Sequence, residues 1–179
     1  MQGISFTIQN PDSIPEANQP VIYTDKVDKN KLTFSFTQNL GIPSIGPADS
    51  FSIRFPKAAL VKASPKMLTS KSWVVEHLQN PTTSSPYYTF LLQPAKKIPF
   101  EDNTLEITFQ GLPGKEQALL DVSVSYTIRG AKVPAVNQGA KLHVTAYPDK
   151  PNMLSDNILL PSVIINGGNR YSRIYLGIA

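Results

Sequence analysis

The sequence contains no cysteine among its 179 residues and only two histidines, His77 and His143. The chain therefore has no disulfide scaffold, no thiolate zinc site and no cysteine nucleophile. No hydrophobic run approaches the roughly 18–20 residues that a membrane-spanning helix requires. Met1 is followed by QGISFTIQN, which is not the hydrophobic core of a signal peptide. We expect a soluble globular protein with little catalytic chemistry and no cofactor.

The net charge is small, but the cations are unevenly distributed. The chain has 17 basic and 13 acidic residues, which gives a net charge of +4. Five cations and no acid lie between positions 54 and 75: Arg54, Lys57, Lys62, Lys66 and Lys71. This segment is either a solvated loop or a surface that contacts an anionic partner, such as an anionic membrane. Nucleic acid is not favoured, because this segment holds only two aromatic residues, Phe55 and Trp73, and single strands need a stacking platform.

Hydrophobic and hydroxyl-bearing residues alternate along most of the chain. Alternation with a period of two is typical of strands with one buried and one solvated face. The alternating runs are 4–8, 32–37, 51–55, 88–92, 105–109, 122–128, 142–144, 158–160 and 174–178, with further candidates at 20–24 and 73–77. Helical patterns are scarce: 57–62 has room for one turn, and 114–120 is a short helix or a loop.

Proline, glycine and asparagine separate these runs, as turns between strands require. The polar stretch 79–85 is expected to be a hairpin loop. The pattern predicts an all-β fold: an antiparallel β-sandwich, immunoglobulin-like or jelly-roll-like, with about nine to eleven strands. We expect one domain over 1–179, closed by a hairpin at 155–179. Pro161 places that strand at an edge or a bend.

Two segments, LTFSFTQNLGIPSIGPADSFSIRFP (32–56) and NTLEITFQGLPGKEQALLDVSVSYTI (103–128), resemble immunoglobulin-like β-sandwich modules of bacterial secreted and surface proteins. The resemblance lies in the spacing of strands and turns, because the Cys–Trp–Cys core of true immunoglobulin domains is absent. It implies a structural or adhesive module, and hence binding rather than catalysis.

Catalytic and metal-binding patterns are poorly matched. The segment 41–46 has one residue too many for a G-x-S-x-G elbow. The acids Glu76, Glu101, Asp102, Glu106 and Asp121 are candidates for a glycosidase pair by number alone. Two short segments, 25–30 and 101–103, carry oxygen ligands suited to calcium but match no EF-hand loop. Ordinary turn chemistry explains them equally well, and we predict no metal site and no enzyme.

Aromatic residues give the more specific indication of a site. Tyr87 and Tyr88 follow the 82–85 loop, and Trp73 precedes that loop by nine residues. Aromatic faces stack on sugar rings, but in a sandwich Trp73 is as well suited to the core, and only one of the two tyrosines faces outward. The predicted site residues are Trp73, Tyr87, Tyr88, Lys57, Lys62, Lys66 and Lys71.

These features favour a non-enzymatic binding, structural or assembly module of a secreted or surface-exposed protein, with a protein partner or self-assembly. Two alternatives remain. One is a subunit of a secreted toxin or a phage-tail-like particle, in which the lysines meet anionic membrane. The other is a carbohydrate-binding module that uses Trp73, Tyr87 and Tyr88.

Overall fold

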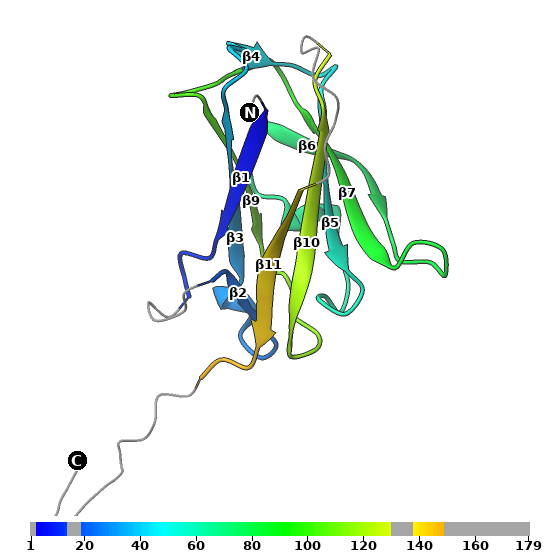
Figure 1. The fold of residues 1–179 in the computed structure, drawn as a ribbon. Helices are drawn as coiled ribbons and strands as arrows, with labels where there is room; N and C mark the ends of the chain where they lie inside the picture. Colours follow the sequence, from blue (N-terminus) through cyan, green and yellow to red (C-terminus); the bar gives the residue numbers. More distant parts are fainter. Residues whose placement is uncertain (1–2, 14–18, 130–137, 149–179) are drawn as a thin grey trace, which may run out of the picture. The chain divides into compact units, whose positions relative to one another are not determined.

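The computed structural model describes residues 3–13, 19–129 and 138–148 of the chain. Eleven strands in these ranges form three sheets (Figure 1). A three-stranded sheet has the order β1 (Ile4–Gln9), β3 (Lys31–Gln38), β9 (Thr104–Gln110). A six-stranded sheet has the order β2 (Val21–Tyr23), β11 (Gln138–Thr145), β10 (Ala118–Thr127), β5 (Ser50–Pro56), β7 (Tyr87–Pro94), β6 (Trp73–Gln79). The short strands β4 (Ser44–Ile45) and β8 (Ile98–Pro99) pair with each other.

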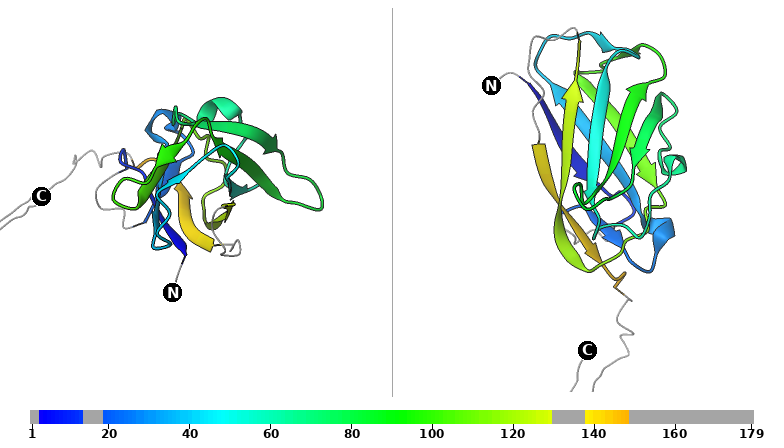
Figure 2. Two further views of the ribbon diagram at one scale, coloured as in Figure 1. Left: turned by 90° about the horizontal axis from the view of Figure 1, so that it is seen from above. Right: turned by 90° about the vertical axis from the view of Figure 1, so that its right-hand side faces the viewer.

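The two larger sheets pack face to face, which confirms the predicted β-sandwich. The right-hand view of Figure 2 shows the six-stranded sheet in front of β1 and β3. The alternation seen in the sequence sets the two faces: along β3 and β5, every second residue is buried between the sheets. On the outer face of the three-stranded sheet, hydroxyl side chains lie opposite one another across the strands, as Thr33 and Thr108 do at 3.2 Å between Oγ1 atoms.

The structure decides between the alternatives that the sequence left open for the short segments. The segment 114–120, expected to be a short helix or a loop, contains no helix, because the backbone amides of Lys115 and Glu116 donate to the carbonyls of Ala59 and Ala58 and β10 begins at Ala118. Two 3-10 turns lie elsewhere instead, η1 (Val27–Lys29) and η2 (Pro65–Met67). The segment 57–62 is a turn, as allowed for.

The sandwich is not wholly antiparallel. β2 runs parallel to β11, with Val21 opposite His143 and Tyr23 opposite Thr145. All three residues of β2 are buried, so this strand lacks the alternation of a half-exposed antiparallel strand. Its direction depends on a pairing with a strand more than 100 residues away, which the local pattern does not encode.

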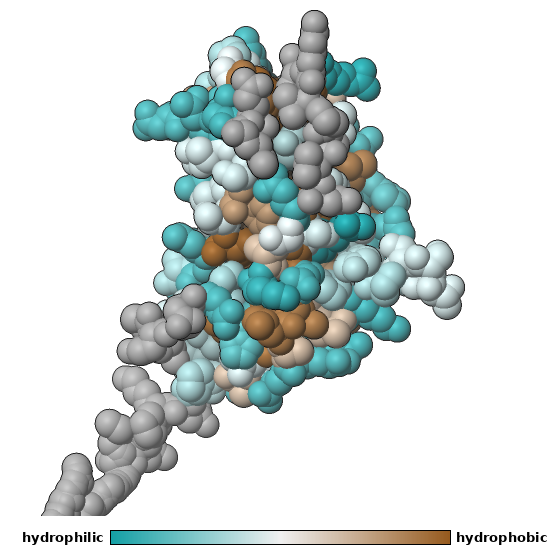
Figure 3. Space-filling model, viewed as in Figure 1, coloured by the Kyte–Doolittle hydropathy of each residue, from teal (hydrophilic) through white to brown (hydrophobic). Residues whose placement is uncertain are grey.

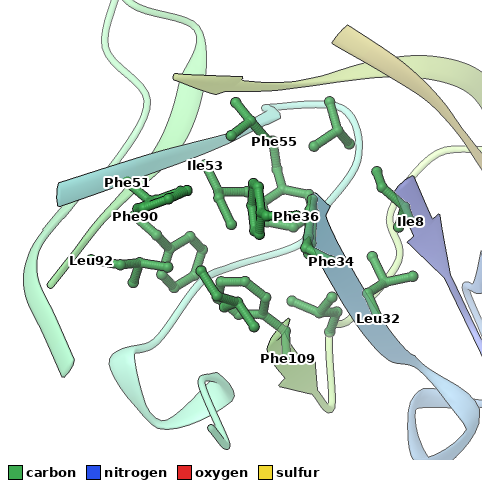
Figure 4. Packing of buried hydrophobic residues seen from close by; sticks show 14 of the residues in the cluster. Ile8, Leu32, Phe34, Phe36, Phe51, Ile53, Phe55, Phe90, Leu92 and Phe109 are labelled. Atoms are coloured by element: carbon green, nitrogen blue, oxygen red, sulfur yellow. The ribbon is translucent and has the colours of Figure 1, made fainter. Parts of the chain in front are cut away.

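The core between the sheets is a cluster of aromatic rings (Figure 4). Phe34, Phe36 and Phe109 of the three-stranded sheet interleave with rings of the six-stranded sheet. Phe36 packs edge-on against Phe51, and Phe109 packs edge-on against Phe90, each at 4.9 Å between ring centroids. Edge-to-face pairs of this kind add to the stabilisation that burial of the rings provides.

The two sides of the sandwich are closed differently. On one side, the β5–β6 connection runs along β9, where the amide of Thr69 donates to the carbonyl of Thr108 at 2.9 Å. On the other side, β1 meets β10 and β11 through few contacts: Gln138 Nε2 donates to the Ile4 carbonyl, and the Ile4 amide donates to the Tyr126 hydroxyl at 3.4 Å. Figure 3 shows hydrophobic surface on this side, among hydrophilic residues.

A buried asparagine joins β2 to the loop after β9. Asn30 is fully buried, and its side-chain oxygen accepts from the Tyr23 amide at 2.7 Å. Its Nδ2 donates to the carbonyls of Tyr23 at 2.7 Å and of Leu112 at 2.6 Å. The amide group thus pairs with β2 as a neighbouring strand would, which satisfies the backbone of a buried strand. A Cβ at Gly114 would lie 2.8 Å from the Tyr23 carbonyl oxygen, so this approach requires glycine.

The sandwich belongs to the first of two compact units, Met1–Ala146 and Tyr147–Ala179. The predicted closing hairpin at 155–179, the strands 158–160 and 174–178 and the bend at Pro161 lie outside the described residues.

Candidate binding site

A shallow pocket lies where β5 ends and β7 begins. Its volume is about 320 Å³, at the small end of the range for ligand pockets. It is lined by Pro56, Lys57, Ala58, Pro86, Tyr87, Lys115 and Glu116, and is called the Tyr87 pocket below. Most of this lining is apolar, with charged side chains from three of the seven residues.

The fold holds the lining in place through backbone hydrogen bonds. The Lys57 amide donates to the Pro86 carbonyl at 2.9 Å, which ties the end of β5 to the start of β7. The Lys115 and Glu116 amides donate to Ala59 and Ala58 at 3.0 and 3.1 Å, which brings in the segment before β10. Three parts of the chain that are far apart in sequence therefore meet in one rigid pocket.

A cationic side chain, that of Arg54, packs against the ring of Tyr87. The Arg54 guanidinium carbon lies 5.0 Å from the ring centroid, within the range of a cation–π contact. Arg54 Nε donates to the Ser123 hydroxyl at 3.0 Å, which fixes the guanidinium on the outer face of the six-stranded sheet. Tyr87 is half-buried, while Lys57 and Lys115 are exposed. The pocket thus combines an aromatic ring with two lysines and one carboxylate, Glu116, and Arg54 lies against that ring.

The structure separates the two tyrosines, as the alternation of β7 predicts. Tyr88 points into the core with 9% of its surface exposed, and its hydroxyl donates to the Val61 carbonyl at 3.1 Å. Trp73 is only 4% exposed, and its ring packs edge-on against Phe51 at 5.3 Å. Both side chains are core residues in this structure, so neither presents a ring face to a ligand.

The remaining predicted lysines lie along the β5–β6 connection. Lys62, Lys66 and Lys71 are exposed, and none of them lines the Tyr87 pocket. Lys71 lies near Lys96 and Lys97 at the other end of the connection, because the Ala95 amide donates to the Ser72 carbonyl at 2.8 Å. The structure therefore brings two of the seven predicted residues, Tyr87 and Lys57, into one site.

Sequence reasoning missed Lys115 and Glu116. They stand in a segment with no strand or motif pattern, almost 60 positions after Lys57, and only the folded chain makes them neighbours. Arg54 was visible as part of the cationic run. Its position on β5, opposite Thr89 and two residues from the strand end at Pro56, could have associated it with Tyr87.

The residues considered for catalysis do not come together. His77 lies on β6 and His143 on β11, and three strands separate them in the six-stranded sheet. At about 4.8 Å between neighbouring strands, the two strands that carry these histidines are roughly 19 Å apart. Glu106 lies on the outer face of the other sheet.

The two segments considered for calcium binding, 25–30 and 101–103, use their polar side chains within the protein. Asn30, grouped with Asp25 and Asp28 by sequence, points inward and uses its side-chain amide within the core. The Asn103 side-chain oxygen accepts from Gln38 Nε2 at 3.0 Å, inside a tight turn with positive φ at Asp102 and Asn103. No group of three His, Cys, Asp or Glu residues suited to a metal ion occurs in the described part of the chain.

No protein-family model and no curated protein matches the chain. Among solved structures, it is similar to a cohesin module from a family 33 glycoside hydrolase of Clostridium perfringens, with 8% identity and a TM-score of 0.46 over 80% of this chain and 99% of that one. It is also similar to a family 123 glycoside hydrolase of Clostridium perfringens, with 14% identity and a TM-score of 0.37; the match covers 80% of this chain and 28% of that enzyme. At these sequence identities and TM-scores, neither similarity supports a conclusion about function.

Across the described residues, no helix has the length and apolar character needed to span a membrane.

Proposed function

We propose that this chain is a non-enzymatic binding or assembly module of a secreted or surface-exposed protein, and that the Tyr87 pocket is its contact site. The observation that carries this proposal is the pocket itself: an aromatic ring and two prolines stand beside Arg54 and two exposed lysines. Tyrosine and arginine are the residue types that most often dominate binding energy in protein interfaces.

One further feature supports a protein partner in an extracellular setting. The chain resembles immunoglobulin-like modules of bacterial secreted and surface proteins in its strand and turn spacing. The alternative of a toxin or phage-tail-like subunit shares this setting, and it would use the exposed lysines of the β5–β6 connection on anionic membrane.

Site-specific photo-crosslinking tests the proposal. A variant of the protein carries a benzophenone amino acid at position 87 and is added to the surface and secreted proteins of the source cells. After irradiation, we expect one discrete crosslinked adduct. The matched control carries the same group in place of Thr7, which is exposed on the outer face of β1. Adducts that form equally at both positions, or no adduct at 87, would contradict the proposal.

A second candidate function is carbohydrate binding, favoured by the accessible ring of Tyr87. Since Trp73 and Tyr88 are core residues here, the platform would be reduced to this one ring. A selective hit on a glycan array that Tyr87→Ala abolishes would support this function. A blank array leaves the protein partner as the better account.

A further inference from the structure

We infer that the Tyr87 pocket takes an acidic peptide segment of its partner: an apolar side chain in the pocket, flanked by carboxylates that pair with Arg54, Lys57 and Lys115. This inference rests on the proposed function and names the ligand of that same site. Three properties of the pocket support it, namely its apolar lining, its unbalanced charge and the absence of serine, threonine, asparagine and glutamine from the lining.

The apolar lining suits an apolar side chain. Pro56, Pro86, Ala58 and the ring of Tyr87 supply the hydrophobic contacts. A volume of about 320 Å³ has ample room for a phenylalanine or leucine side chain. Burial of such a side chain against proline and tyrosine is favourable, because it removes apolar surface of both partners from water.

The charge around the pocket is not balanced by the protein. Within residues 3–13, 19–129 and 138–148, the one salt bridge joins Lys141 of β11 to Asp121 of β10. None of Arg54, Lys57 and Lys115 is therefore paired with a carboxylate of these residues. Glu116 is the single acid in the lining, so the surroundings of the pocket carry an excess of positive charge that an anionic partner would complement.

A peptide suits the lining better than a sugar because the lining combines apolar contacts with cations. The lining contains no serine, threonine, asparagine or glutamine. The two prolines have no amide hydrogen, and the amides of Lys57, Lys115 and Glu116 are used within the protein. The groups left to bind the hydroxyls of a sugar are the side chains of the charged residues and of Tyr87. An apolar side chain flanked by carboxylates uses both the apolar lining and the cations.

Fluorescence anisotropy with three labelled peptides tests the inference. The first has the core Asp-Glu-Phe-Glu-Asp, the second replaces Phe by Gly, and the third replaces the four acids by Lys. We expect the first peptide to bind at least about tenfold more tightly than the other two. Its affinity should fall severalfold between 50 mM and 500 mM salt, because exposed ion pairs are screened.

Charge-reversal variants locate the binding. Lys57→Glu combined with Lys115→Glu is expected to weaken the first peptide by about tenfold or more. Lys62→Glu combined with Lys66→Glu, an equal change of charge on neighbouring exposed positions, is expected to change its affinity by less than about threefold, through the net charge alone. Unchanged melting temperatures will show that both variants are folded.

Several results would overturn the inference. The acidic peptide could fail to bind at protein concentrations up to about 2 mM, where even weak complexes are detected. The lysine peptide could bind equally well, or the two variants could lose equal affinity. An acidic glycan that binds through Tyr87 would also overturn it, in favour of a sugar ligand. If the crosslinker at position 87 captures a partner while the acidic peptide fails, the proposed function stands and only the ligand class is wrong.

Discussion

Replacing Asn30 by alanine should destabilise the protein more than almost any other single change of a polar residue. Its side chain makes three hydrogen bonds in a fully buried position, to the amide and carbonyl of Tyr23 and to the carbonyl of Leu112. Alanine removes all three of these buried hydrogen bonds. An orphaned buried group costs about 1–3 kcal/mol, so we expect a loss of roughly 3–5 kcal/mol in the free energy of unfolding.

Urea unfolding followed by tryptophan fluorescence measures this loss. Trp73 is the single tryptophan of the chain and is buried against Phe51, so its emission reports on the core. The same loss should lower the melting temperature by roughly 10–15 °C for a domain of this size. Asn30→Asp should be at least as destabilising at neutral pH, because it places a negative charge beside two carbonyl oxygens.

Gln110→Ala is the matched control. Gln110 is an exposed amide residue at the end of β9, and its removal should change stability by less than about 0.5 kcal/mol. A loss below about 1 kcal/mol for Asn30→Ala would refute the reasoning, because it would mean that water or a local rearrangement satisfies the three backbone groups.

Three further predictions concern other parts of the chain. Gly114→Ala should cost about 1–3 kcal/mol in urea unfolding, because the new methyl group meets the Tyr23 carbonyl at 2.8 Å; a neutral result would show that this loop moves freely. Asp49→Ala should cost about 2–4 kcal/mol in the same assay, since the buried carboxylate accepts from two backbone amides at 2.8 Å, and Asp49→Asn should cost less; equal losses would contradict this account. Lys62→Glu with Lys66→Glu should leave capture of the partner by the position-87 crosslinker within about twofold of the parent chain. Binding of the parent chain to anionic vesicles that disappears in this double variant would instead favour the membrane-acting subunit.

The sequence predicts the strands well, because burial on one face of a sheet imposes a period of two. β3, β5, β7 and β9 each show it over six or more residues, and each was located from it. Tyr88 was predicted as a site residue, but it shares the buried face of β7 with Phe90. The segment 20–24 was only a further candidate for a strand, because the three residues of β2 are all buried and therefore do not alternate.

Only part of the site could be predicted from the sequence, for a physical reason. Lys57 could be predicted as a site residue because it belongs to a basic run, and Tyr87 because it is an aromatic residue beside a loop. Lys115 joins them through backbone hydrogen bonds between distant segments, and no local pattern encodes such contacts. The role of Asn30 could not be predicted for the same reason. Its position before β3 is typical of a turn residue, and only the folded chain provides its three hydrogen-bond partners.

The central claim is that the chain binds a partner through the Tyr87 pocket. Nuclear magnetic resonance of the labelled chain, titrated with the partner captured by the crosslinker, tests it most directly. We predict that the amide signals of Ala58, Tyr87, Lys115 and Glu116 shift, while those on the outer face of β1, β3 and β9 stay in place. Shifts centred on that outer face, with the pocket signals unchanged, would contradict the account.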